Sequence, residues 1–118
     1  MTVVYHKVLK YDGKEWKVAV PVTIPLTTAT SGSDVTVFTP TNGFAVIDVL
    51  VITNTDPSTD TNVTVKDGTT TLITLPVSAG QTVTVPIKLV VKDKLTINSS
   101  ATTVTVVGSG EDYQELVE

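Results

Sequence analysis

The sequence predicts an all-β fold, an antiparallel β-sandwich of the jelly-roll kind with an N-terminal β-hairpin arm. Thr and Val make up 45 of the 118 residues, and β-branched side chains favour the pleated surface of a strand. The two alternate strictly at residues 63–65, 82–85 and 103–106, which places Val on one face of a strand and Thr on the other. Regularly spaced turn signals predict about seven or eight short strands in the body, and this count leaves an immunoglobulin-like topology open.

The arm is predicted from a turn signal near the start of the chain. Residues 4–11 and 15–20 flank Asp12-Gly13-Lys14, and Asp-Gly is among the strongest hairpin signals because its turn needs positive φ angles. Pro21 and Pro25 lack the amide hydrogen that a central strand donates, so the next stretch is expected to be an edge or a connector. The expected divisions are an arm at residues 1–26, a sandwich body at 27–110 and an acidic C-terminal tail at 111–118.

The body is expected to begin after a polar loop at residues 27–34. Its strands are separated by segments rich in Gly, Pro, Asn, Asp and Ser, such as 40–43, 54–61 and 76–80, which are typical of turns. The strand at 44–53 contains the run VLVI, which indicates burial on both faces. Pro86 marks a bulge or an edge within the strand at 81–89. The remaining strands are expected at 35–39, 62–66, 70–75, 95–98 and 103–107, and the last residues, 111–118, are expected to form a loose tail or a single turn.

The alternation also predicts which side chains form the core. In the last strand Val106 is expected inside and Thr105 outside, and a one-residue slip would exchange them. The predicted core consists of Val35, Val37, Phe44, Val46, Val49, Val51, Val63, Val65, Leu72, Leu75, Val83, Val85, Leu89, Leu95, Ile97, Val104 and Val106.

Composition argues against several classes of function. The formal charge is −4, and nucleic-acid binding needs a basic face. With no cysteine there is no thiol nucleophile or thiolate metal site. Apolar runs such as 49–52 are far too short to span a bilayer. The residues after Met1 lack the basic start and apolar stretch of a signal peptide, so we expect synthesis in the cytoplasm and no membrane partner.

Chemistry-bearing residues are sparse, and the sequence predicts no enzyme and no cofactor. His6 has no nucleophile and carboxylate pattern around it, so it is expected at a surface or an interface. Asn54, Asp56 and Asp60 share one loop and could ligate calcium, but Pro57 and the missing EF-hand glycine and glutamate favour an ordinary Asx-rich turn. We therefore predict no metal, and treat Asn54, Asp56 and Asp60 as a possible binding loop.

The aromatic residues of the arm are the strongest candidates for a contact with a partner. Tyr5, Tyr11 and Trp16 gather in the predicted hairpin together with Lys14 and Lys17, and an exposed aromatic cluster is typical of a protein-binding patch. Two alternatives stay open: Trp16 covers the open end of the sandwich, or the rings stack on a sugar.

Several segments resemble a small β-module of tailed-bacteriophage virion proteins. The similarity covers residues 45–110, and the hairpin 11–16 (YDGKEW) is similar to Asp-Gly-x-x-Trp tips of phage tail, fibre and head proteins. Asp93-Lys94 stands where the family usually has Gly-Asp. The segments that carry the resemblance are 51–55 (VITNT), 63–68 (VTVKDG), 76–80 (PVSAG), 88–95 (KLVVKDKL) and 99–101 (SSA).

This resemblance implies a non-enzymatic virion structural protein, most specifically a capsid decoration (cement) subunit. Such a subunit binds the major capsid protein or other virion proteins and often clusters as a homotrimer, and its final location is the virion. The alternative from the residues is a carbohydrate-binding or adhesion module of tail or fibre type, with loops 27–34 and 54–61 at its binding end.

Overall fold

The described residues form strands and turns without any helix. The computed structural model describes residues 9–11, 16–41 and 43–115. Their strands are β1 (Leu9–Tyr11), β2 (Trp16–Ala29), β3 (Asp34–Phe38), β4 (Phe44–Asn54), β5 (Thr61–Asp67), β6 (Thr70–Val77), β7 (Thr82–Thr84), β8 (Leu89–Val91), β9 (Leu95–Ser99) and β10 (Val104–Glu115).

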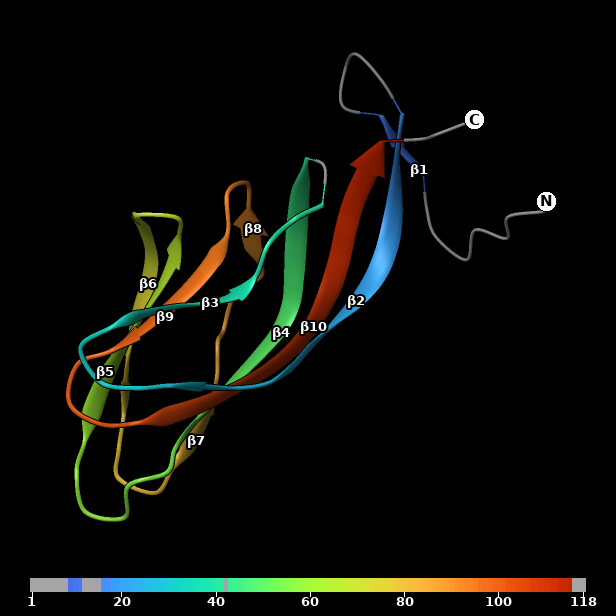
Figure 1. Cartoon of the computed structure of the whole chain (residues 1–118). Coiled ribbons are helices and arrows are strands. Elements are labelled where there is room, and N and C mark those ends of the chain that lie inside the picture. Colours follow the sequence, from blue (N-terminus) through green and yellow to red (C-terminus); the bar gives the residue numbers. More distant parts are fainter. Residues whose placement is uncertain (1–8, 12–15, 42, 116–118) are drawn as a thin grey trace.

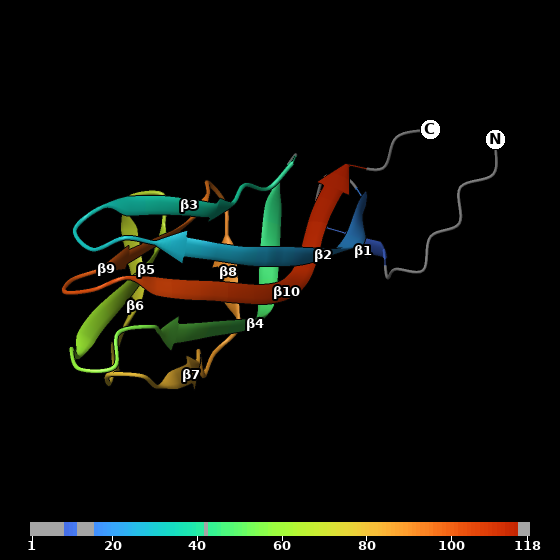
Figure 2. The ribbon, with the colours of Figure 1, turned by 60° about the horizontal axis from the view of Figure 1, so that its bottom comes forward.

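Two antiparallel sheets pack face to face as a sandwich (Figure 1). The six-stranded sheet has the order β1-β2-β10-β4-β7, with β8 also pairing with β4. The four-stranded sheet has the order β3-β9-β5-β6. Figure 2 shows β2, β10, β4 and β7 lying side by side across one layer. The predicted all-β sandwich is confirmed.

The pairing of the strands is that of a jelly roll. The chain is paired as one long antiparallel hairpin, β2 with β10, β3 with β9, β4 with β7 and β8, and β5 with β6. Its tip is the Asp67–Thr70 turn, where Gly68 takes a φ of 61° that suits glycine. Rolling this hairpin up places β10 beside β4 and β9 beside β5. Early strands pair with late strands, one pair inside the next, which is the pairing of a jelly roll and not of the immunoglobulin-like alternative.

The arm is an extension of the six-stranded sheet. Leu9 pairs with Val18 and Tyr11 with Trp16, so the predicted hairpin is confirmed over these residues, whereas its expected turn lies outside the described residues. The pairing of β2 with β10 continues to Lys17 and Glu115. The ends of both strands, together with β1, project past the four-stranded sheet (Figure 1).

Two expected irregular segments are strands instead. The loop predicted at 27–34 is shorter, because β2 continues to Ala29 opposite Val104. The tail predicted at 111–118 is wrong as far as Glu115, because that part of β10 pairs with β2 throughout, and with β4 as far as Tyr113. Ladder pairing on two sides outweighs the weak strand propensity of Glu, Asp and Gln. The expected divisions at 26/27 and 110/111 therefore fall inside continuous strands. The strand expected at 81–89 is divided around Pro86 into β7 and the start of β8.

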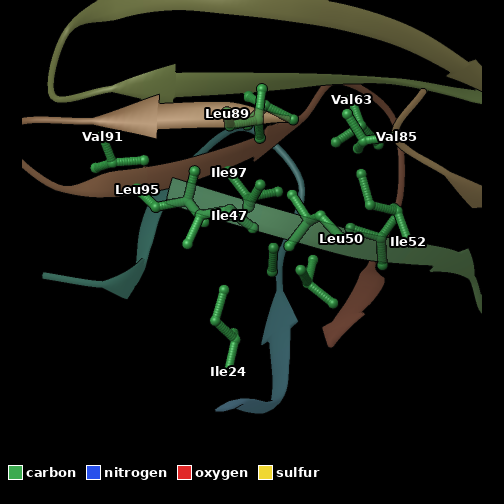
Figure 3. Packing of buried hydrophobic residues seen from close by; sticks show 14 of the residues in the cluster. Ile24, Ile47, Leu50, Ile52, Val63, Val85, Leu89, Val91, Leu95 and Ile97 are labelled. Atoms are coloured by element: carbon green, nitrogen blue, oxygen red, sulfur yellow. The ribbon is translucent and has the colours of Figure 1, made fainter. Parts of the chain in front are cut away.

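The core lies between the sheets and confirms the predicted register of the last strand. Val104 and Val106 are fully buried, whereas Thr105 is not. Figure 3 shows Val63, Val85, Leu89, Leu95 and Ile97, which are buried as predicted. Val65 is buried as well, and the predicted residues Val35, Val37, Leu72, Leu75 and Val83 pack partly buried against this core.

In β4 the predicted core is wrong. Phe44, Val46, Val49 and Val51 were expected inside, but the buried residues are Ala45, Ile47, Leu50 and Ile52. Both faces of this strand are apolar, so alternation alone does not distinguish the inner face, and a slip of one residue exchanges the two sets. Asp48 is an extra, unpaired residue in the ladder with β10, which explains why Ile47 and Leu50, three residues apart, share a face.

Candidate functional site

The candidate contact residues of the arm come from one short hairpin. Tyr11 and Trp16 are directly opposite in the ladder of β1 and β2, and Lys17 is opposite Lys10. Tyr5 and Lys14 lie outside the described residues. The fold therefore brings the backbones of Tyr11, Trp16 and Lys17 together at the projecting end of the six-stranded sheet.

An aromatic pair supports the base of this arm. The rings of Phe44 and Tyr113, from β4 and β10, stack with centroids 4.7 Å apart and planes 9° from parallel, and the two residues are ladder partners. Burial raises the pKa of the Tyr113 hydroxyl, and the negative charges of Glu111 and Asp48 raise it further. The phenol is therefore neutral at pH 7. Sequence reasoning missed this pair because it assigned Tyr113 to a tail.

A buried carboxylate ties the same region to the preceding loop. Asp112 of β10 is buried, and its two oxygens accept the backbone N–H of Thr41 at 3.4 and 3.1 Å. The Gln114 side-chain amide donates to the same carboxylate at 3.2 Å. These bonds hold the loop that precedes β4 against β10.

The second predicted site, in the loop after β4, is held together by its own polar groups. Asn54 is buried, and its amide donates to the carbonyls of Thr59 at 2.7 Å and Val77 at 3.2 Å. Its side-chain oxygen accepts the N–H of Asp56 at 3.0 Å. The structure thus brings Asn54 and Asp56 into direct contact.

The carboxylates of this loop are engaged by backbone and hydroxyl donors. Asp56 accepts the N–H and the hydroxyl of Ser58 at 2.8 and 3.0 Å and the hydroxyl of Thr102 at 3.2 Å. The bonds from Ser58 lower the pKa of Asp56. Asp60 accepts the N–H of Ala79 at 2.9 Å. Such bonding is typical of an Asx turn, and among the described residues no group of three or more His, Asp or Glu side chains is placed to hold a metal ion.

An open hollow of about 450 Å³ lies beside Asp60. Hydroxyl and amide side chains contribute much of its wall, and none of the lining residues is aromatic, so the stacking platform common in sugar sites is missing from this hollow. The lining consists of Asp60, Thr61, Asn62, Pro76, Val77, Ser78, Ser100 and Ala101.

The outer faces of the two sheets differ sharply in chemistry. On the four-stranded sheet, Asp34 accepts the amide of Asn98 at 2.8 Å and the Lys66 ammonium at 3.2 Å. On the six-stranded sheet, five outward positions of β4, β8 and β10 are valine, beside outward Thr53, Thr105 and Ser109. We call this set the outer valine face; it comprises Val46, Val49, Val51, Val90 and Val107.

The outer valine face is continuous across three strands. Val46 pairs with Val90, and Val51 pairs with Val107, and ladder partners project to the same side of a sheet. The β10 partner of Val49 is Ser109. The VLVI run predicted burial on both faces of β4, but this is wrong for the outer face of the single chain, where Val49 is 44% exposed.

Comparison with known proteins places the fold but no family. The sequence matches no protein-family model and no curated protein. The structure resembles a protein from Bacillus endospore appendages, which form a family of disulfide-linked pili; the TM-score is 0.59 at 12% identity, over 92% of this chain and 99% of that one. A chain from infectious bursal disease virus, Gx strain, matches with a TM-score of 0.45 at 13% identity over 92% of this chain, which spans 36% of that viral chain.

The described part of the chain contains no helix long and apolar enough to cross a membrane.

Proposed function

We propose that this protein is a non-enzymatic structural subunit that associates with further copies of itself and with other components of a larger assembly. The observation that carries the proposal is the continuation of β2 and β10 past the sandwich, with β1 paired to the end of β2. A jelly roll of this size is closed by its own core, so strands that extend past that core provide surface for a neighbour.

The specific assembly we propose is a virion, in which the chain is a capsid decoration subunit. The resemblance of residues 45–110 to phage virion modules supports this assignment. In this role Tyr11, Trp16 and Lys17, with Tyr5 and Lys14, form the contact with the major capsid protein, and the subunits cluster as a homotrimer. Aromatic side chains are enriched in such contacts.

The first test is the mass of the purified protein by light scattering after size exclusion. A homotrimer has three times the subunit mass of 12.5 kDa, and symmetric closure of this kind is usual for structural subunits. A mass of one subunit at every concentration, together with no particles in electron micrographs, contradicts the proposal.

The role of the arm is tested with point variants. Deleting the arm up to residue 25 is unsuitable, because it would remove most of β2, including the core residue Ile24. We expect Tyr11→Ala combined with Trp16→Ala to abolish binding to capsids that lack a decoration protein, measured by co-sedimentation. Thr74→Ala, at an exposed position of β6, is the matched control. Equal binding by both variants contradicts the arm assignment.

A second candidate is a subunit of a surface filament. It is favoured by the likeness to the endospore pilus protein, which covers almost the whole of both chains. Because this sequence contains no cysteine, copies of it would join without disulfides. Filaments formed by the purified protein alone, seen in electron micrographs, would favour this candidate over the decoration subunit.

A further inference from the structure

The outer valine face has the composition of a buried surface but is exposed in the single chain. Strands that read as continuous apolar runs are normally covered on both faces, and here the sandwich covers only one face of β4. The best-exposed large apolar side chains of the described residues lie on or beside this surface: Leu26 at 71%, Ile87 at 51%, Val90 at 47%, Val49 at 44% and Val107 at 38%. Such a clustered apolar surface marks an interaction site.

Both margins of the face continue its apolar character. The ladder of β2 with β10 shifts between Ile24 and Thr27, which leaves Leu26 in a bulge opposite Val107. Ile87 lies in the segment between β7 and β8. Charge on the face is concentrated at Asp48, Lys88 and Glu111, and the ammonium of Lys88 lies 3.4 Å from the Asp48 carboxylate.

We propose that the outer valine face packs against the same face of a second copy of this chain. The proposal rests on the proposed function as a self-associating subunit and names the surface that joins two copies. Two sheets stacked face to face interdigitate their side chains at a spacing of about 10 Å. A two-fold axis that lies in the plane of the interface brings valines against valines, and it can set Lys88 of one copy near the acidic residues of the other.

The extent of the face suits such a pair. From Phe44 to Thr53, ten residues of β4 at about 3.3 Å each span about 33 Å, and three strands about 4.8 Å apart span about 14 Å. Each copy therefore offers about 460 Å², and a pair buries about 900 Å², the size of a weak, transient interface. A pair of this size dissociates on dilution, which makes the contact measurable.

Lysine substitutions test the face in the full chain. We expect Val49→Lys combined with Val107→Lys to weaken pairing at least 100-fold, because the pair would bury unpaired ammonium groups. Light scattering across a concentration series should then give half the mass of the wild-type assembly, because only the two-fold contact between copies is lost. Asn62→Lys combined with Thr74→Lys adds the same charge at exposed positions of β5 and β6, and it should keep the wild-type mass. Unchanged melting temperatures show that both variants fold.

Single cysteines give an independent readout, because the sequence has none of its own. We expect Val49→Cys and Val107→Cys to form covalent dimers on mild oxidation, with Thr74→Cys remaining largely monomeric. Equal cross-linking of all three variants overturns the proposal, as does an oligomer whose mass is unaffected by the lysines at 49 and 107. In that second case the subunit still self-associates, so the proposed function stands while the assigned surface fails. A wild type that is monomeric up to millimolar concentration also overturns the pairing of copies, and a different protein bound through the same face would then be its occupant.

Discussion

The two outer faces of the sandwich use the same residue types for different purposes. The four-stranded sheet turns Val63 and Val65 inward and Thr64 outward, so its outer face is hydroxylated and can be hydrated. The six-stranded sheet has buried residues on the inner face of β4 and valines on the outer face as well. The difference teaches that Thr–Val content alone does not decide solubility of a surface. The position of Thr and Val in the alternation decides which sheet has a hydrated outer face and which has an apolar outer face suited to a partner.

The largest expected effect comes from moving one charge across the six-stranded sheet. Val106 is fully buried and Val107, the next residue, is partly exposed on the outer face. Val106→Asp should therefore destabilise by about 4 kcal/mol or more, enough to unfold many domains. Val107→Asp should remain folded. Urea unfolding followed by circular dichroism measures both. Similar unfolding midpoints for the two variants would mean that the faces are not distinguished by burial.

A smaller effect is expected where β10 crosses closest to β4. A side chain at Gly110 would collide with the backbone of Val46 and Ile47, and backbone cannot move aside as a flexible side chain does. Gly110→Ala should cost about 1–3 kcal/mol, as overpacking does. Ser109→Ala, the exposed neighbour, is the control and should be nearly neutral in the same thermal unfolding experiment. An equal loss of stability in both variants would show that strand propensity, and not the contact with β4, is the cause.

The smallest effect concerns the polar face. Hydrogen bonds from Asn98 and then Lys66 lower the pKa of Asp34. A lowered carboxyl pKa stabilises the fold above the unfolded-state value near 3.8, and this stabilisation is lost as pH falls through the lower folded value. Asp34→Asn should slightly lower the melting temperature at pH 6, and the difference from wild type should vanish towards pH 2. A difference that persists unchanged at pH 2 would show that charge on Asp34 is not its source.

The predictions succeeded where strict alternation or a strong turn signal was present. Val106 inside, Thr105 outside, and the hairpin around Asp12-Gly13 over its described strands all follow from local chemistry. They failed in β4, where both faces are apolar, and at the end of β10, where acidic and amide residues pair in the ladders with β2 and β4. The structure bears out only part of what the sequence suggested about the candidate site residues. Asn54 and Asp56 are neighbours as their spacing suggests, but their polar atoms bond within the loop, and the stack of Phe44 on Tyr113 depends on a pairing too distant in sequence to anticipate.

The sequence alone determined that the chain is all-β, where its sharpest turns lie and which strands have one apolar face. These properties depend on neighbours within a few residues, through χ1 stiffness, alternation and turn chemistry. The jelly-roll order, the inner face of β4 and the length of β10 instead follow from contacts between distant parts of the chain. Each of these depends on which distant strand pairs alongside, and the Asp48 bulge and the close approach at Gly110 are defined only by that pairing. The outer valine face depends on both levels: the sequence supplies its apolar residues, and the fold determines that they are exposed.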